Sequence, residues 1–445
     1  MYSSELSGLF ARLGIALGDT ISVTSKDGTT EGILMPRPDV GENNIIVIKK
    51  KDGYNIGVRY EKGMKIAKVS SGSGIPSFPK ATAKHDKSLQ NISLLYTGGT
   101  IGSKIDYVSG GVYMLTKPEE LLHEVPELSG IANIDVSNIM SIASEDMTYK
   151  GWQQIADGVA NAFQKGARGV VITHGTDSMH YTSAALSFML QDLSGPVILT
   201  GSQRSSDRGS SDAFMNLICS AQLAAKSDFA EVGICMHSSS SDTSCALIRG
   251  TKARKMHTSR RDAFKSINEG PVALVDASGK IEYKSPYRKA PKNAKPKVLA
   301  MTKFEDKVAL IKAYPNSDPG IIEYYIGKGY KGIMIEAMGL GHVPTPASNE
   351  YSWISHMKDA VDEGLVLGIT SQCLYGRVNP TVYRNLRLAA STGAVYCEDM
   401  LPEVAYVKLG FLLGNHKADK AKEMLSKNIA GEITQRREFN DDFIE

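Results

Sequence analysis

The sequence has few cysteines, and none of them forms a CxxC pair. The five cysteines are scattered between residues 219 and 397: Cys219, Cys235, Cys245, Cys373 and Cys397. An odd, widely spaced set argues against a disulfide framework and against a cysteine zinc site. The histidines and carboxylates show no zinc-like spacing either, so we expect no metal in this chain. A reducing cytoplasm is the simplest location for such a protein.

An excess of charge of one sign and long apolar runs are also missing. The 51 Lys and Arg residues face 48 Asp and Glu residues, a net charge of +3. This near balance excludes a basic arm that binds nucleic acid by charge alone. The longest apolar runs have the length of a strand, well short of the ~18 residues of a membrane span. The first 20 residues lack the basic start, apolar stretch and cleavage site of a signal peptide.

The 445 residues suggest two or three domains, and the composition changes along the chain accordingly. Residues 1–75 contain short β-branched runs separated by turn signals such as Asp27-Gly28 and Asp52-Gly53. This pattern predicts a small antiparallel β-barrel. The runs lack the alternating basic and aromatic residues of a base-stacking surface, so we interpret this domain as a docking module. Residues 76–90 have the Ser, Gly, Pro and Lys content of a linker.

The remainder of the chain alternates apolar strand-like runs with helical patterns, which predicts an α/β fold with parallel sheets. We expect a large domain over 91–290, a short linker over 291–298, a smaller domain over 299–415 and a helical tail over 416–445. The predicted strands are 92–96, 169–173, 196–200, 308–311, 332–335 and 366–370, and the clearest helices are 152–163, 179–190 and 418–427.

Glycine and hydroxyl residues follow three of the predicted strands, in residues 97–103, 173–179 and 200–203. Functional residues of parallel sheets gather at the carboxyl ends of the strands. Glycines allow the backbone to approach a ligand closely, and hydroxyls can act as nucleophiles beside a base. No GxxxxGK[ST] phosphate loop is present. Asp177 could cap a helix or could orient a proton-transfer group such as a lysine.

Five motifs together resemble the L-asparaginase family: TGGTIGS at 97–103, HGTDSM at 174–179, KMHTSRRDAFKS at 255–266, ASEDM at 143–147 and QCLYG at 372–376. The likeness extends over about residues 91–415. It implies a two-domain asparaginase core with parallel sheets, here preceded by the small antiparallel β-barrel. The extra N-terminal domain and the tail after Leu413 are similar to a specialised branch, the D subunits of archaeal glutamyl-tRNA(Gln) amidotransferases.

The resemblance also implies which residues carry the chemistry. Thr100, the second threonine of TGGT, matches the family's nucleophilic threonine. Thr176 and Asp177 match its Thr-Asp pair, and Lys255 matches the lysine that pairs with that aspartate. Thr176 remains a rival nucleophile. The basic run that contains Lys255, residues 249–261, is otherwise a solvated loop or an RNA-phosphate patch.

Three further residues match positions that bind the substrate in the family. Tyr113 falls at the position of the flap tyrosine, and Ser144 at that of the serine that holds the substrate carboxylate. Glu145 stands where asparaginases usually have glutamine, which argues against simple asparagine hydrolysis. We expect His174 and His257 to have structural roles.

The resemblance implies the function as well. The chain would release ammonia from glutamine as the glutaminase subunit of the enzyme that converts Glu-tRNA(Gln) to Gln-tRNA(Gln). A partner E subunit would use ATP and magnesium and would make most tRNA contacts, so this chain needs no cofactor. We expect a heterodimer, paired as a dimer of heterodimers, with no membrane association. The alternatives are a stand-alone L-asparaginase/glutaminase and a non-catalytic regulatory or RNA-binding protein.

Overall fold

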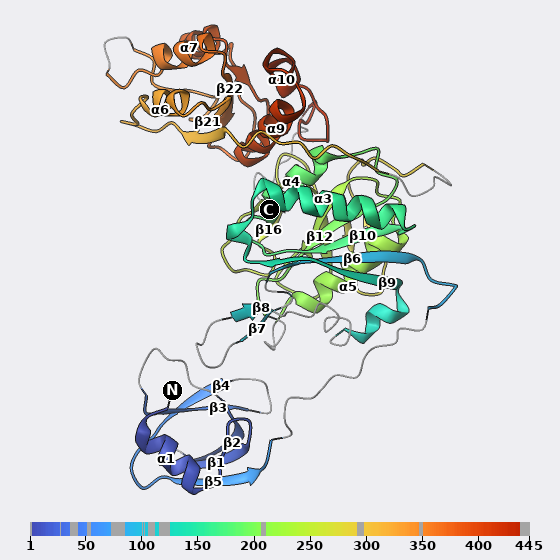
Figure 1. The fold of residues 1–445 in the computed structure, drawn as a ribbon, viewed down its shortest axis with the longest axis vertical. Helices are drawn as coiled ribbons and strands as arrows, with labels where there is room; N and C mark the ends of the chain where they lie inside the picture. The colour runs from blue at the N-terminus through green and yellow to red at the C-terminus, as the bar shows by residue number, and fades with distance from the viewer. Residues whose placement is uncertain are drawn as a thin grey trace.

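The computed structural model describes most of the chain as three parts arranged in sequence order (Figure 1). The described residues are 2–26, 28–35, 43–50, 55–72, 85–99, 101, 103–105, 112–114, 125–205, 211–291, 298–346 and 350–436. No helix in this described part is both long enough and apolar enough to cross a membrane.

The N-terminal domain is a five-stranded antiparallel sheet with one helix. Its elements are α1 (Ser4–Arg12), β1 (Thr20–Ser25), β2 (Gly28–Leu34), β3 (Ile45–Lys49), β4 (Asn55–Arg59) and β5 (Lys65–Ser70), in the sheet order β4-β3-β2-β1-β5. Ser3 caps α1 by accepting a hydrogen bond from the Leu6 amide at 3.2 Å. Leu6 and Phe10 of α1 are buried in the domain's core, whereas Leu13, just beyond the helix, is 41% exposed.

The large domain is built on an eight-stranded sheet in the order β18-β17-β14-β13-β12-β10-β6-β9. The strands are β6 (Asn91–Gly98), β9 (Asn133–Ile142), β10 (Gly169–Thr173), β12 (Val197–Thr200), β13 (Val232–His237), β14 (Cys245–Arg249), β17 (Ala273–Val275) and β18 (Ile281–Tyr283). The first five of these strands are parallel, and β14, β17 and β18 are antiparallel. The expected parallel sheet is therefore mixed, because short connections after β13 return the chain directly.

Three helices cover the two faces of this sheet. Helices α3 (Tyr149–Gln164) and α4 (Met179–Met189) lie on one face, and α5 (Ala213–Lys226) lies on the other (Figure 1). All five residues of β10 are buried between them, as expected for a parallel strand covered on both sides. Smaller elements are β7 (Ser103–Ile105), β8 (Val112–Met114), η2 (Pro126–Gly130), η3 (Ser144–Asp146), β11 (Leu190–Gln191), β15 (Ala253–Lys255), β16 (Phe264–Ser266) and β19 (Leu299–Ala300).

The C-terminal domain has a four-stranded parallel sheet in sequence order. Its elements are β20 (Val308–Lys312), α6 (Ile321–Gly327), β21 (Gly332–Ala337), α7 (Ile354–Asp362), β22 (Val366–Ser371), α8 (Arg384–Ser391), β23 (Val395–Tyr396), α9 (Pro402–Asn415) and α10 (Ala418–Leu425). Helix α9 packs against α4, with the rings of Phe188 and Phe411 stacked 6.0 Å apart. One hydrophobic core therefore continues across both α/β domains.

Candidate active site

The loops after β6 and β10 meet at the carboxyl edge of the large-domain sheet. Thr97 donates a hydrogen bond through Oγ1 to the Thr173 carbonyl at 2.7 Å. Gly99 has φ +87°, and a Cβ at this position would lie 2.5 Å from the Gly175 nitrogen. The close approach of the two loops thus requires glycine, because a side chain at residue 99 would strike the second loop.

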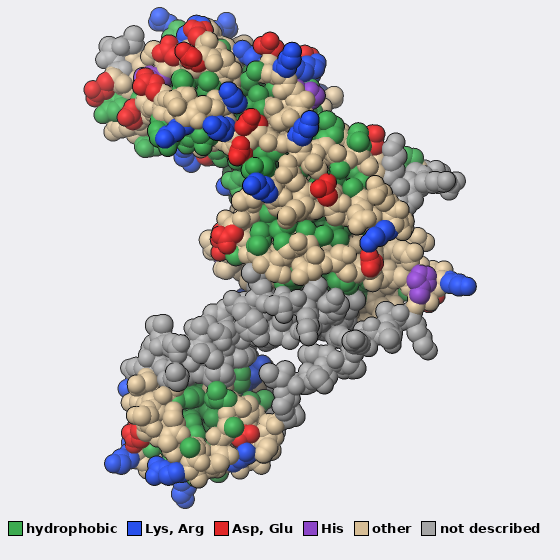
Figure 2. All heavy atoms as spheres, in the orientation of Figure 1, with side chains coloured by type: hydrophobic (Ala, Val, Ile, Leu, Met, Phe, Trp, Pro, Cys, Tyr) green, Lys and Arg blue, Asp and Glu red, His purple; other side chains and the backbone are tan. Residues whose placement is uncertain are grey.

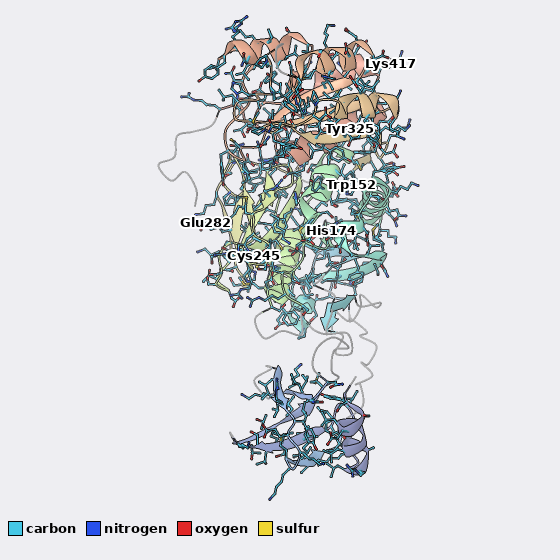
Figure 3. The ribbon with its side chains drawn as sticks, turned by 90° about the vertical axis from the view of Figure 1, so that its left-hand side faces the viewer. Trp152, His174, Cys245, Glu282, Tyr325 and Lys417 are labelled. Carbon is cyan, nitrogen blue, oxygen red and sulfur yellow. The ribbon has the colours of Figure 1, made fainter. Side chains whose placement is uncertain are left out.

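A chain of buried hydrogen bonds supports the loop after β10 from the core of the large domain. His174 is 1% exposed, and burial lowers its pKa to about 4, so the ring is neutral at physiological pH. Its Nδ1 lies 2.7 Å from the Gly175 carbonyl and its Nε2 lies 2.9 Å from Thr182 Oγ1. Trp152 donates to the same hydroxyl at 3.1 Å, and Figure 3 shows Trp152 and His174 inside the large domain. His174 therefore supports the loop from within the core.

A lysine from the β15–β16 hairpin reaches the end of this loop. Lys255 Nζ donates to Asp177 Oδ1 at 2.6 Å and to Thr176 Oγ1 at 2.9 Å. The Lys255 side chain is 11% exposed and that of Asp177 is 66% exposed. A hydroxyl, an amine and a carboxylate thus form one cluster that opens to solvent on the Asp177 side. Such a cluster can move a proton to or from a bound group.

Ser144, in η3, joins this cluster from a third loop. The Asp177 amide donates to Ser144 Oγ at 3.3 Å, and Ser178 Oγ donates to the Ser144 carbonyl at 2.5 Å. Ser144 is buried, and a Cβ on Gly175 would lie 2.7 Å from its hydroxyl oxygen. Glu145, the next residue, is exposed.

Two of the residues expected in the site are described only in part or not at all. Thr100 lies outside the described residues. The backbone of Tyr113 belongs to β8 and pairs with Lys104 of β7 in a two-stranded antiparallel hairpin. The side chain of Tyr113 lies outside the described part of the chain.

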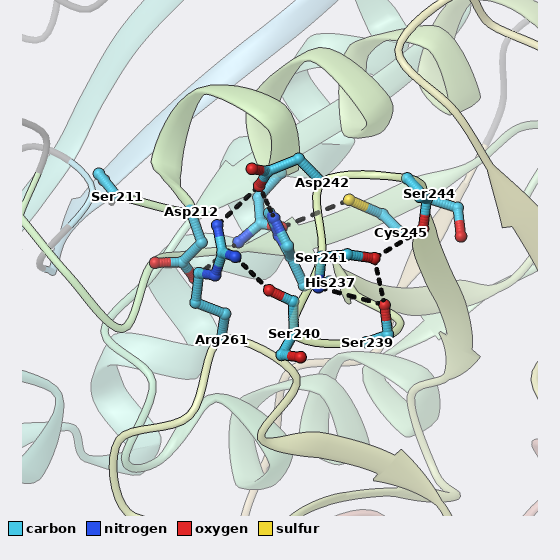
Figure 4. A network of polar contacts seen from close by, with 12 residues as sticks. Ser211, Asp212, His237, Ser239, Ser240, Ser241, Asp242, Ser244, Cys245 and Arg261 are labelled. Atoms are coloured by element: carbon cyan, nitrogen blue, oxygen red, sulfur yellow. Dashed lines mark hydrogen bonds and ion pairs between the residues drawn. The ribbon is translucent and has the colours of Figure 1, made fainter. Parts of the chain in front are cut away.

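A polar network at the end of β13 is not predicted by the sequence patterns (Figure 4). The buried His237 ring contacts Asn216 Oδ1 at 2.6 Å through Nδ1 and Asp242 Oδ1 at 3.0 Å through Nε2. Asp242 also accepts from Arg261 Nη1 at 2.7 Å, and its pKa is lowered chiefly by the hydrogen bond from His237. The network fastens the turn between Lys255 and β16 to the sheet edge. Its only sequence signal is a run of polar residues after a buried strand.

The basic run 249–261 does not form an open patch. Its cations outside the Lys255 cluster all contact carboxylates: Arg249 with Glu231 and Glu269, Lys252 with Asp399, Arg254 with Glu403, Arg260 with Asp262, and Arg261 with Asp242. These charges are balanced by carboxylates within the protein, which argues against the interpretation of this run as an RNA-phosphate patch. His257 accepts from the Ser259 and Arg260 amides at 3.1 Å in the hairpin turn.

Positive and negative side chains are also mixed on the face of the C-terminal domain that is seen in Figure 2. Across the described residues, no group of three or more His, Cys, Asp and Glu side chains is arranged to hold a metal ion. The groups described at the sheet edge are hydroxyl, amine, carboxylate and backbone amide groups.

Family models match three segments of the chain. Residues 15–69 match the GatD N-terminal domain, residues 91–288 match Asparaginase, N-terminal, and residues 307–425 match the Glutaminase/Asparaginase C-terminal domain.

Two solved L-asparaginase structures resemble most of this chain. An L-asparaginase from Thermococcus kodakarensis has a TM-score of 0.68 and 29% identity, and covers 78% of this chain and 100% of its own. L-asparaginase I from Vibrio cholerae has a TM-score of 0.68 and 30% identity, with 78% and 99% covered. These likenesses agree with the expected asparaginase-like α/β fold.

Curated relatives match almost the whole chain. The D subunit of glutamyl-tRNA(Gln) amidotransferase from Pyrococcus furiosus is 49% identical over 429 residues, which cover 95% of each chain. The D subunit from Methanopyrus kandleri is 44% identical, with 97% of this chain and 94% of the relative covered. The expectation of an amidotransferase subunit with an amidohydrolase core, and not a stand-alone asparaginase, is confirmed. The chain belongs to the family of glutamyl-tRNA(Gln) amidotransferase D subunits.

Proposed function

We propose that this chain hydrolyses the side-chain amide of glutamine by means of a threonine nucleophile and passes the ammonia to a partner E subunit. One observation carries the proposal: the Lys255 amine contacts both the Thr176 hydroxyl and the Asp177 carboxylate. This cluster lies in a chain that also carries the N-terminal domain of the amidotransferase subunits. The partner would use the ammonia to convert Glu-tRNA(Gln) to Gln-tRNA(Gln).

The reaction requires a base, an oxyanion donor and a proton for the leaving nitrogen, because a carboxamide is a poor electrophile. In the proposed mechanism Thr100 attacks the carbonyl carbon while Lys255, held by Asp177, accepts its proton through Thr176 or water. The C–N bond breaks, the nitrogen takes up that proton and leaves as ammonia, and glutamate remains as an ester on the threonine. Water then hydrolyses the ester and restores the hydroxyl.

Backbone amides of the first two loops would stabilise the oxyanion. We assign this role to the loops at residues 98–100 and 176–177. Ser144 would hold the α-carboxylate of glutamine, Tyr113 would cover it from the flap, and exposed Glu145 would line the entrance.

The partner completes the proposed function. Ammonia released into water would be protonated and diluted, so hydrolysis should stay weak until the partner and charged tRNA are bound. ATP, magnesium and the ligase step are assigned to the E subunit, and this chain needs no cofactor. We propose that two heterodimers pair and that the complex works in the cytoplasm.

The test is to replace Thr100 and Thr176 separately with valine and to measure glutamine hydrolysis in the complex. The variant that lacks the nucleophile should lose about 10²–10⁴-fold or more in turnover. Wild-type rates in both variants would contradict the mechanism. High activity of the isolated chain on asparagine would support a free asparaginase instead.

A further inference from the structure

A carboxylate of the C-terminal domain contacts both elements that carry the candidate catalytic cluster. Glu403 lies in the first turn of α9 and is 1% exposed. Its Oε2 is 2.5 Å from Arg254 Nη1, and its Oε1 is 3.9 Å from His180 Nε2. Arg254 directly precedes Lys255 in β15, and His180 follows Asp177 by three residues in α4. Figure 1 shows α9 at the boundary with the large domain.

The two contacts differ in kind. The Arg254 contact is an ion pair between a guanidinium and a buried carboxylate at the N-terminus of a helix, where negative charge is stabilised. The His180 contact is not an ion pair, because the imidazole ring is neutral. Burial lowers the pKa of His180 to about 3, with further lowering by Arg254, Lys255 and His174, against an opposite effect of Asp177. The Glu403 charge is therefore matched by Arg254.

The ion pair fixes the strand that carries the lysine. Successive side chains of a strand point to opposite faces. The ion pair that holds Arg254 on one face therefore also sets the direction of the Lys255 side chain on the other. A second ion pair lies at the start of the same hairpin, where buried Lys252 is 2.8 Å from Asp399 of the C-terminal domain. The hairpin that supplies the amine is thus anchored to the second domain by two ion pairs whose carboxylates are both buried.

We infer that Glu403 is a positioning residue for amide hydrolysis, which acts through Arg254 on the Lys255 amine. The inference rests on the proposed role of Lys255. A misplacement of about 1 Å in a catalytic group can cost about 10²-fold in rate. Since Glu403 belongs to the C-terminal domain, any contact that shifts α9 also shifts the amine. The C-terminal domain thereby affects the position of the catalytic amine of the large domain.

The test uses the full chain in complex with its partner and charged tRNA. Glu403→Gln should lower kcat for glutamine hydrolysis about 10–100-fold and leave KM within about twofold. Arg254→Lys keeps the cation but loses the guanidinium geometry, and should lower kcat in the same way. The matched control is Glu432→Gln, which removes another buried carboxylate. Glu432 pairs at 2.6 Å with Lys408 of α9, the helix that also carries Glu403. The kcat of this control should equal that of wild type.

A double variant separates positioning from a general loss of structure. In a Lys255→Met background, Glu403→Gln should change the residual turnover less than about twofold, because its effect passes through the missing amine. Wild-type kcat in Glu403→Gln or Arg254→Lys, a change confined to KM, or full additivity with Lys255→Met would overturn the inference. Should Glu403→Gln not fold, Arg254→Lys decides. An inactive wild-type complex would instead refute the proposed function.

Discussion

Both α/β domains contain parallel strands covered by helices, but they differ at the carboxyl edges of their sheets. In the large domain this edge brings together Thr176, Asp177, Lys255 and Ser144. In the C-terminal domain the corresponding polar groups bind backbone: the Gln372 amide donates to the Glu336 carbonyl at 3.1 Å, and Ser371 Oγ donates to the Gly339 carbonyl at 2.6 Å. At one edge the polar side chains contact one another and open to solvent at Asp177, and at the other they hold the backbone of loops.

The difference shows that the shared architecture does not by itself make a site. The amine of the large domain comes from a hairpin outside the main sheet, which is anchored by the polar network of His237, Asp242 and Arg261 and by ion pairs to the second domain. Parallel sheets offer a place for chemistry at the strand ends, but the loops and insertions decide whether it is used.

The strongest test of this contrast replaces one lysine at each edge. Lys255→Met should lower glutamine turnover about 10²–10⁴-fold, equivalent to about 3–5 kcal/mol, because it removes the proton acceptor. Lys312→Met is the control, since Lys312 forms an exposed ion pair with Glu336 at 3.1 Å on the C-terminal edge. Ammonia release from the complex measures both. Equal turnover in the two variants would refute the assignment of the site to the large domain.

A second comparison separates fold from chemistry. Glu432→Gln breaks a fully buried pair with Lys408 and should lower the free energy of unfolding by about 3–5 kcal/mol, since it leaves a buried cation uncompensated. Glu423→Gln, at an exposed position of α10, should leave the urea midpoint near that of wild type. Urea unfolding at pH 7 checks both. An unchanged midpoint in Glu432→Gln would show that the ion pair contributes nothing to the free energy of unfolding.

Acid should weaken the large domain through two of its buried histidines, which are neutral in the folded chain. The pKa values of His174 and His180 fall from 6.5 to about 4 and about 3 on folding. Below pH 6.5 the unfolded chain therefore binds protons that the folded chain excludes, and stability falls as pH falls toward these values. From pH 7 to pH 5 each histidine should cost about 2 kcal/mol. Urea unfolding of His174→Gln should show a correspondingly smaller loss, and an identical pH dependence would contradict this account.

The smallest effect concerns substrate binding. Ser144→Ala should raise the KM for glutamine about tenfold, or about 1.4 kcal/mol, with a smaller change in kcat, because it removes a proposed contact to the substrate. Ser371→Ala, which removes a hydroxyl from the other edge, should leave both constants unchanged. Steady-state kinetics of the complex measure them. A fall in kcat alone would assign Ser144 to the support of Asp177 rather than to the substrate.

Local sequence patterns are sufficient for the elements that are buried on both sides. Residues 169–173 are predicted as a strand and form β10 within the same bounds, because five consecutive apolar or small residues end at a glycine-containing loop. The antiparallel strands β14, β17 and β18 are not predicted. β17 and β18 have three residues each, and the pairing of β14 with β17 joins residues 30 positions apart, Cys245 and Val275 (275 − 245).

The site is predicted in part, and the reason differs from residue to residue. Thr176 and Asp177 follow a strand, so their position at the sheet edge can be inferred from the chain itself. Lys255 is selected from many lysines only by the resemblance. Glu403 lies in an ordinary helical segment and carries no sequence signal, because its significance comes from Arg254, a residue 149 positions away (403 − 254).

The sequence alone determined the order of domains, the buried strands and the glycine-hydroxyl loops, since these follow from hydrophobic periodicity and backbone preferences within a few residues. Only the tertiary structure decided which charges meet. The basic run 249–261 reads as a surface patch until its carboxylate partners are brought in from outside the run. Ion pairing depends on distances of a few ångströms between remote residues, and no local pattern contains that information.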